Sequence, residues 1–436
     1  MKKVTLPSSS FILHLSSFIP NWTHNKMVAW RKTFYSMCAA QFISMVGFAF
    51  VMPFLPFYIV QDLGVPKNQS VQWASILMAA VGLPMAVFAL VWGHLADHRY
   101  GRKLMVLRSM VAGTVIVALM GLVHNVHQLL VLRIIQGMLT GTVSAGMALV
   151  ASETPTERSA YALGVFQAAV IAGISFGPLM GGHAAMLIGF RPTFYLAAGL
   201  IFAGALIVHL GVKETFTPPV GEKVKTGTYR ELFAAGGFLT AILVLFLVNF
   251  GTFAPAPVFP YFVKELSGKP YDEAAAVTGQ IMFVVGFADM VSAWFLGHLA
   301  DQWGHKRMLV LCTLLAGLFS LPFYFARTIT HLYILRFIFG LAIGGVLPSL
   351  YAIIRRITPE RDMGKAFGVT AFIAGAAFCL GPLSGGYLAL LAGKPGEPYY
   401  VAPFLMCGVA LILISALASW RVRSAPLPNG CRPPMR

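Results

Sequence analysis

Charge is scarce in this sequence. Only 11% of the 436 residues are charged, whereas 58% are hydrophobic. An ordinary soluble domain carries roughly 25% charged residues, so the composition excludes a water-soluble globular protein. Apolar stretches of about 20 residues recur along the chain, each long enough to cross the hydrocarbon of a bilayer. Because backbone polar groups cannot stay unsatisfied in lipid, we predict an all-α polytopic membrane protein.

Several kinds of site are also missing. The five cysteines are scattered and form no CxxC pair, which argues against disulfides and against a metal site. No P-loop of the GxxxxGK type occurs, so no ATP site is predicted and any transport is driven by a gradient. No HExxH sequence and no pair of aspartates within the spans points to an intramembrane enzyme. We therefore predict a protein that is not an enzyme and has no metal or cofactor.

The net charge of +17 comes from an excess of Lys and Arg. Most of them lie on the connections that share one side of the membrane with both termini, and only Arg133 and Arg336 are placed inside spans. This asymmetry follows the positive-inside rule. It predicts cytoplasmic termini in a bacterial inner membrane and argues against nucleic-acid binding. Twelve spans are predicted, near residues 34–60, 72–95, 104–123, 127–151, 160–187, 192–212, 235–262, 274–299, 308–326, 331–354, 366–391 and 400–420.

A short charged turn occurs twice. Gly93–Lys103 and Gly297–Arg307 both lie between long apolar runs, and both carry Gly, Asp and basic residues in the same order. Pro53 and Pro257, near the ends of the first and seventh spans, lie 204 residues apart. Landmarks that recur in one order and at one spacing indicate two homologous six-helix halves.

The predicted domain organisation follows from this duplication. The two halves are joined by a polar segment and flanked by two polar ends, of which the first is expected to be disordered. The five parts are a cytoplasmic N-terminal segment (1–33), an N-terminal half (34–212), a cytoplasmic linker (213–234), a C-terminal half (235–420) and a cytoplasmic tail (421–436).

The motifs resemble those of the major facilitator superfamily. Gly93–Lys103 resembles its cytoplasmic motif between helices two and three, and Leu132–Gly137 its arginine motif in helix four. Gly173–Gly182 resembles the fifth-helix motif of the antiporters. Over residues 30–421 the chain is similar to the twelve-helix drug:proton antiporters. This resemblance implies two halves of nested inverted repeats, a small-molecule substrate, protons as coupling ions, and a monomer in the lipid bilayer.

Two groups of residues are candidates for conformational change. The family resemblance implies that the repeated turn forms a latch between the halves. The alternative is that its basic residues only fix the orientation of the chain in the membrane. The first turn has one residue more than the second, which leaves open whether Arg99 or Arg102 pairs with Asp97. The latch candidates are Gly93, Asp97, Gly101, Arg102, Gly297, Asp301 and Gly304. The antiporter-motif candidates, for gating or for close packing alone, are Gly173, Gly177, Pro178, Gly181, Gly182, Gly381 and Pro382.

One acidic residue is predicted near the middle of a span. Asp289 lies among apolar neighbours, and ionisable residues inside a membrane are functional candidates by default. Burial without a partner favours the neutral form of a carboxyl group, so Asp289 is a candidate for proton coupling or for attracting a cationic substrate. A structural aspartate is the alternative. The family resemblance adds Arg133 as a second residue for proton coupling.

The substrate cavity is predicted from aromatic and amide side chains in helices one, four and seven. Such walls suit bulky apolar or cationic compounds, although an aromatic stripe in a bundle can serve packing alone. The candidates are Phe50, Phe54, Gln136, Asn249 and Phe253.

The predicted function is a secondary active transporter that exports amphipathic or cationic drugs in exchange for protons by alternating access. One alternative is a carrier for a physiological metabolite such as a sugar or an organic anion. The fifth-helix motif and the lack of clustered polar residues in the spans argue against it. The other alternative is a membrane receptor without transport, which would not need a duplicated bundle with gating motifs in both halves.

Overall fold

The computed structural model describes residues 24–95, 100–214, 229–234, 237–359, 362–394 and 397–421. This part of the chain is helical and holds no β-strand beyond one isolated bridge, between Lys394 and Glu397. The helices before the linker are α2 (His24–Ala49), α3 (Leu55–Gln61), α4 (Lys67–Leu95), α5 (Arg102–Met120), α6 (Val126–Leu139), α7 (Thr142–Glu153), α8 (Ser159–Ile188) and α9 (Phe190–Gly211).

In the rest of the chain, α10 lies within the predicted linker and the helices from α11 on repeat this order. The helices of this part are α10 (Tyr229–Ala234), α11 (Phe238–Phe253), α12 (Phe259–Ser267), α13 (Tyr271–Trp303), α14 (His305–Ser320), α15 (Ile329–Ile343), α16 (Val346–Ile357), α17 (Met363–Ala392) and α18 (Ala402–Arg421). Short 3₁₀ turns, η2 (Thr156–Arg158) and η3 (Leu321–Phe325), complete the described elements.

Ten helical segments in the described residues are long and apolar enough to cross a membrane. The first and seventh predicted spans differ from continuous helices, since each is divided in two: α2 with α3, and α11 with α12. Prolines lie at both divisions, where each removes a backbone donor. The first helix also begins at His24 and not at residue 34, so residues 24–33 are helical.

The fourth and tenth spans are broken as well, where continuous helices were predicted. The fourth divides between α6 and α7 at Thr140 and Gly141, and the tenth between α15 and α16 at Gly344 and Gly345. Helices α7 and α16 begin 204 residues apart, the same offset as the paired prolines. Pro348, the third residue of α16, has no N–H to donate to the carbonyl of Gly344, whereas the fourth span has no proline at its break. The sequence analysis did not use Pro348.

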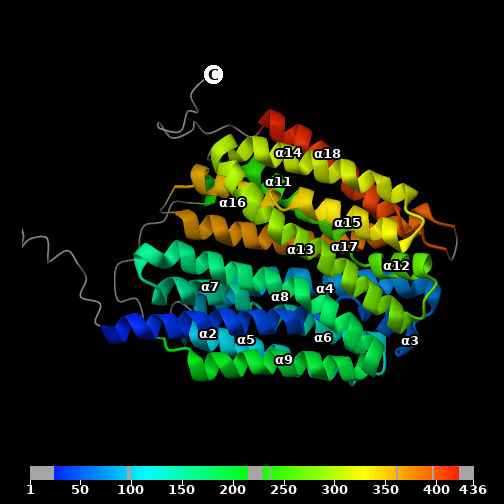
Figure 1. Cartoon of the computed structure of the whole chain (residues 1–436), viewed down its shortest axis with the longest axis horizontal. Coiled ribbons are helices and arrows are strands. Elements are labelled where there is room, and N and C mark those ends of the chain that lie inside the picture. Colours follow the sequence, from blue (N-terminus) through cyan, green and yellow to red (C-terminus); the bar gives the residue numbers. More distant parts are fainter. Residues whose placement is uncertain are drawn as a thin grey trace, which may run out of the picture.

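The two halves lie side by side in Figure 1, with α2 to α9 in one and α11 to α18 in the other. The start of α2 and the end of α18 lie at one end of the bundle, which we call the terminal face. Helices α3 and α12 lie at the other end, the opposite face. The halves meet mainly where α8 packs on α13 and where α4 packs on α17.

Small residues allow this close approach. Gly82 on α4 lies against α17 so tightly that a Cβ atom there would sit 2.7 Å from the backbone nitrogen of Cys379. On the other seam, a Cβ on Gly279 of α13 would collide with the carbonyl oxygen of Pro178 on α8. Helix association within a bilayer favours such residues because backbones can then pack directly.

Candidate functional site

Asp289 lies in the middle part of α13 and is half-buried. No hydrogen bond or ion pair joins its carboxyl group to any residue that the structure describes. Its backbone faces the bend of the tenth span, because a Cβ on Gly344 would sit 2.6 Å from the carbonyl oxygen of Asp289. A carboxyl group without a partner at this depth is free to bind a proton or a cation.

Arg133 lies on α6 with only 4% of its surface exposed. Its Nη1 atom donates a hydrogen bond to Oε1 of Gln136, 3.0 Å away, while Nε and Nη2 have no partner in the described part of the chain. Arg133 and Asp289 belong to different halves, and no described contact joins them. The structure therefore places the two predicted coupling residues in separate environments.

Arg336 occupies the corresponding position on α15 but has a different environment. Its guanidinium carbon lies 4.3 Å from the ring centre of Phe259 and 5.0 Å from that of Phe404, with Phe323 and Phe339 further out. Aromatic faces stabilise a desolvated cation. This enclosure accounts for a charge inside the bundle without a carboxylate partner.

Arg108 is a further intramembrane cation that the sequence analysis missed. It lies on α5 with its guanidinium carbon 3.5 Å from the ring centre of Trp92 on α4. Nε and Nη1 of Arg108 are buried without a partner in the described residues. The Trp92 indole N–H donates to the carbonyl oxygen of Met138, 2.7 Å away, in the last turn of α6. The sequence analysis missed Arg108 because it follows the basic turn by only a few residues and was counted with the charges of that turn.

The repeated turn is described only in part, because Asp97 and Arg99 lie outside the described residues. Gly93 has open space around it, and Gly101 has a φ of +76° just before α5. Nη1 of Arg102 donates to the carbonyl oxygen of Ala148 on α7, 3.0 Å away. The pairing of Asp97 therefore stays a prediction.

Glu214 was missed as a partner of this turn. Its two carboxylate oxygens accept hydrogen bonds from the backbone N–H groups of Arg102 and Lys103, at 2.8 and 2.9 Å. Lys103 in return donates from Nζ to the carbonyl oxygens of His209 and Val212 at the end of α9. Each helix end thus receives the charge that its dipole favours.

The second copy of the turn is more exposed. Asp301 is 69% exposed and its Oδ1 lies 3.5 Å from Nε2 of His305. Gly297 has open space around it, and Gly304 has a φ of +96° at the start of α14. Contacts of Asp301 with the other half stay a prediction.

The glycine motif of the fifth span packs against two neighbours, α2 in its own half and α13 in the other half. A Cβ on Gly173 or Gly177 would lie 2.6 Å from α2 atoms, and Gly181 packs against Phe50, the residue that follows α2. Gly182 and Pro178 instead contact α13 of the other half. In the eleventh span, Gly381 packs against Phe250 on α11, and Pro382 lies inside α17. The motif residues hold close contacts, and a gating role remains a prediction.

The predicted cavity residues fall into two classes. Phe50 and Phe54 are buried, and Phe54 stacks on Phe190 at 5.6 Å within the N-terminal half. Asn249 and Phe253 on α11 are half-buried. Nδ2 of Asn249 donates to Leu245 of its own helix, and the ring of Phe253 packs edge-on against Phe378 at 4.9 Å. Gln136 is buried beside Arg133. No described contact brings these five together.

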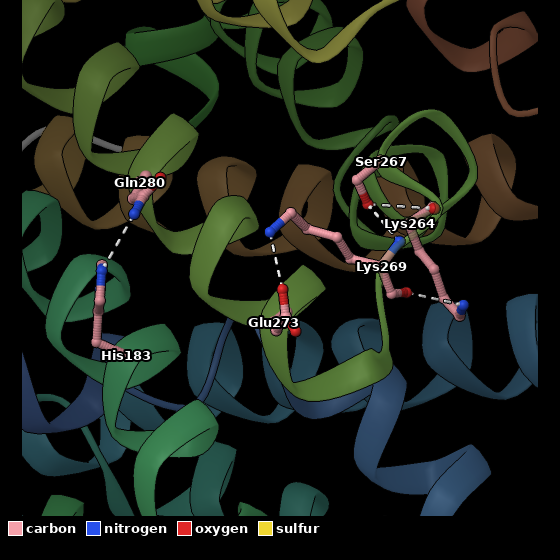
Figure 2. A network of polar contacts seen from close by, with 6 residues as sticks. All are labelled: His183, Lys264, Ser267, Lys269, Glu273 and Gln280. Atoms are coloured by element: carbon pink, nitrogen blue, oxygen red, sulfur yellow. Dashed lines mark hydrogen bonds and ion pairs between the residues drawn. The ribbon is translucent and has the colours of Figure 1, made fainter.

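A polar network that the sequence analysis missed crosses between the halves (Figure 2). His183 on α8 lies with Nε2 3.1 Å from Nε2 of Gln280 on α13, and Gln280 accepts from the Tyr333 hydroxyl at 2.5 Å. The same view shows the ion pair of Lys269 and Glu273, 2.8 Å long, at the start of α13. In the described residues, no three His, Cys, Asp or Glu side chains could hold a metal ion.

Comparisons with known proteins agree with this architecture. The family model described as Major Facilitator Superfamily matches residues 37–326 and 241–434. Multidrug resistance protein MdtG of Serratia proteamaculans is 34% identical over 406 residues, which cover 92% of this chain and 94% of that protein. The multi-drug resistance efflux pump PmrA of Streptococcus pneumoniae is 30% identical over 373 residues, or 85% of this chain and 90% of that protein.

Solved structures share the fold at low sequence identity. The nucleoside transporter NupG superposes with a TM-score of 0.68 at 12% identity, over 89% of this chain and 98% of that one. A bacterial homologue of the human lysosomal transporter Spinster, inward-facing and occupied, superposes with a TM-score of 0.69 at 17% identity, over 92% and 97% of the two chains.

Proposed function

The chain belongs to the major facilitator superfamily, and we propose that it exports amphipathic or cationic drugs in exchange for protons by alternating access. It is a multi-pass membrane transporter and not an enzyme. The names of its relatives, a multidrug resistance protein and an efflux pump, support drugs as the substrate class. We place it as a monomer in a bacterial inner membrane, with the terminal face in the cytoplasm because the sequence predicts most Lys and Arg on that side of the membrane.

The observation that carries proton coupling is the unpartnered carboxyl group of Asp289. A half-buried carboxyl group that pairs with no cation can bind a proton and release it with a modest change of environment. In its charged state it would attract a cationic substrate, so proton and drug would compete for one site. Arg133, which stays charged under nearly all conditions, would support proton coupling through its fixed charge without carrying the proton.

The remaining candidates take supporting roles in this proposal. The repeated turn, with Asp97 and Asp301, would close the cytoplasmic end in one state and release it in the other. The glycine seams would let the halves close tightly at the opposite face. Phe253 and Asn249 on α11, which are half-buried, are the predicted cavity residues best placed to meet a substrate.

Transport of a fluorescent cationic dye in energised everted vesicles tests the proposal. Wild-type protein should move the dye, and a proton uncoupler should stop it. Asp289→Asn should abolish uncoupler-sensitive transport. Asp272→Asn is the matched control, because Asp272 lies in the first turn of the same helix and the variant should transport normally.

Two results would contradict this proposal. Gradient-driven transport that survives in Asp289→Asn would move proton coupling to another residue. An absence of dye transport by well-expressed wild-type protein would favour a carrier for a physiological metabolite.

A further inference from the structure

On both seams between the halves, a glutamine of one half is hydrogen-bonded to a residue of the other. On one seam, Gln280 on α13 meets His183 on α8. On the other, Nε2 of Gln72 on α4 donates to the Tyr387 hydroxyl on α17, 3.5 Å away. His183 and Tyr387 lie 204 residues apart, which is the offset between the two halves. The two contacts are therefore equivalent, but only the imidazole changes its charge near physiological pH.

The hydrogen bonds around His183 run in one direction. Nδ1 of His183 lies 2.7 Å from the carbonyl oxygen of Leu179. Because a carbonyl oxygen can only accept, the ring proton is on Nδ1, and Nε2 of the neutral ring is an acceptor. The Gln280 amide donates to this Nε2, and its oxygen accepts from the Tyr333 hydroxyl. The chain of bonds from α15 through α13 to α8 is therefore complete while His183 is neutral.

A second proton on His183 disturbs this chain. Nε2 becomes a donor and faces the N–H groups of Gln280. If the amide turns its oxygen to the imidazolium, the Tyr333 hydroxyl loses the acceptor that the described residues give it. The cation also lies half-buried, with no carboxylate partner in the described structure, and burial of an unpaired charge is unfavourable. The closed seam therefore opposes protonation of this ring.

His183 lies where the two halves are in direct contact at the opposite face. A Cβ on the preceding residue, Gly182, would collide with the carbonyl oxygen of Ala275 on α13. Separation of α8 from α13 at this level breaks the bond between His183 and Gln280 and exposes the ring to water. In the open state Nε2 can thus take up a proton without losing a partner.

We propose that His183 is a proton-binding site that holds the opposite face closed while it is neutral and releases it when it is protonated. A proton that binds better to the open state shifts the population toward that state. This inference rests on the proposed alternating access, in which the opposite face is the outer one, and adds a second proton site to it. Acid on the outer side then favours the state that is open to that side.

Other titratable side chains surround this position, but none forms a hydrogen bond or ion pair with His183 in the described structure. Arg191 pairs with Asp62, and Lys269 pairs with Glu273. The groups toward the opposite face are Tyr271, Asp272, Glu273 and Asp289 on α13, His331, Tyr333 and Arg336 on α15, Arg191 and Tyr195 on α9, Lys264 and Glu265 on α12, Tyr58 on α3 and Cys38 on α2; those toward the terminal face are Tyr161 on α8, Glu153 on α7, and Glu157 and Arg158 in η2.

A distance across the seam tests the inference. Leu187 on α8 and Phe325 in η3 belong to different halves at the opposite face, and both side chains are well exposed. The distance between Leu187 and the exposed Leu122, both in the N-terminal half, reports that each variant is folded. A ketone-bearing amino acid at each position accepts a spin label and leaves the native cysteines in place. The full-length protein in lipid nanodiscs is measured by double electron–electron resonance at about pH 8 and about pH 5.5, on either side of the usual titration of histidine.

All samples carry Asp289→Asn, so that the proposed coupling residue does not contribute to the response. In this background, acid should raise the ratio of open to closed molecules roughly fivefold, which corresponds to the loss of one hydrogen bond. His183→Gln should remove this response. Gln280→Glu should reverse it, because a carboxylate binds an imidazolium strongly and the seam then closes in acid. Tyr387→Phe, the matched control on the other seam, should leave the response to pH unchanged.

Three results overturn the inference: no response of the Leu187–Phe325 distance, a response that survives in His183→Gln, or a response of unchanged direction in Gln280→Glu. If the Leu187–Leu122 distance shows that His183→Gln is not folded, the direction of the response in Gln280→Glu decides. Failure of the proposed function is a separate result. Gradient-driven dye transport by Asp289→Asn refutes the coupling role of Asp289, whatever the distance across the seam shows.

Discussion

At the scale of single residues, one hydroxyl group joins the two halves at the opposite face. The buried Tyr261 on α12 lies with its oxygen 2.7 Å from the carbonyl oxygen of Pro56 and 3.3 Å from that of Ser70, both in the N-terminal half. Its ring packs edge-on against Phe57 at 5.9 Å. Since this hydroxyl has one proton, it donates to one carbonyl at a time, and either bond must break when the halves separate.

Tyr261→Phe should therefore weaken closure at the opposite face. The loss of one hydrogen bond is worth about 1 kcal/mol, which corresponds to roughly a fivefold change in the ratio of closed to open molecules. Tyr58→Phe is the control, because the Tyr58 hydroxyl donates at 3.0 Å to Met120 within the same half. Labelling of a cysteine introduced on α3 should become faster only in Tyr261→Phe. Equal labelling in both variants would contradict this role.

At the scale of elements, two charged residues cap the ends of two neighbouring helices at the terminal face: Glu214 caps α5, and Lys103 caps α9. The Glu214 carboxylate meets the N-terminus of α5, and the Lys103 ammonium group meets the last carbonyls of α9. Glu214 is also the second residue of the predicted linker (213–234). The start of the linker is thus tied to the turn that precedes α5.

Glu214→Gln should loosen this turn. Removing the charge from a helix N-terminus costs about 1 kcal/mol, so the amides of Arg102 and Lys103 should exchange with deuterium roughly fivefold faster. Glu273→Gln is the matched control, since in the described residues Glu273 pairs with the half-exposed Lys269 and exposed pairs contribute little. Unchanged exchange in Glu214→Gln would show that the cap does not hold the turn.

The sequence predicts a break in a helix only where the residue that causes the break lies in that same helix. The divisions of the first and seventh spans could be anticipated from Pro53 and Pro257, because proline acts on its own helix. The break at Gly344 also has a local cause, Pro348, which the sequence analysis did not use. The break at Gly141 could not be anticipated, because a side chain on another helix, Trp92, bonds a carbonyl group beside it. Periodicity within one span carries no information about such partners.

The same reasoning applies to the candidate site. Asp289 could be identified because an acid inside an apolar span is rare in itself. Glu214 could not be linked to Arg102, since the two are separated by 112 positions in the sequence. Phe54 could not be assigned a face, because whether an aromatic ring lines a cavity or packs on Phe190 depends on the neighbouring helix.

At the scale of the whole molecule, the halves are sealed at the opposite face by direct backbone contact. Helices α8 and α13 meet at Gly182 and Gly279, where neither position has room for a side chain. Alternating access requires this seam to separate when the molecule opens on that side. The seam is therefore expected to control the balance between the two states of the transporter.

Gly279→Ala tests this expectation. The added methyl group would collide with the carbonyl oxygen of Pro178 in the closed state, whereas separated helices have room for it. Overpacking of this kind costs about 1–3 kcal/mol, and here the cost falls on one state only. The variant should favour the state open at the opposite face, with faster labelling of a cysteine on α12 and slower dye export.

Gly199→Ala is the control, because Gly199 lies within α9 with no atom close to the added carbon and the change suits a helix. It should alter neither labelling nor export. If both variants fold and label alike, the seam does not set the balance between states. If Gly279→Ala labels faster but still exports normally, closure at this seam is not the slow step of the cycle, and another step limits export.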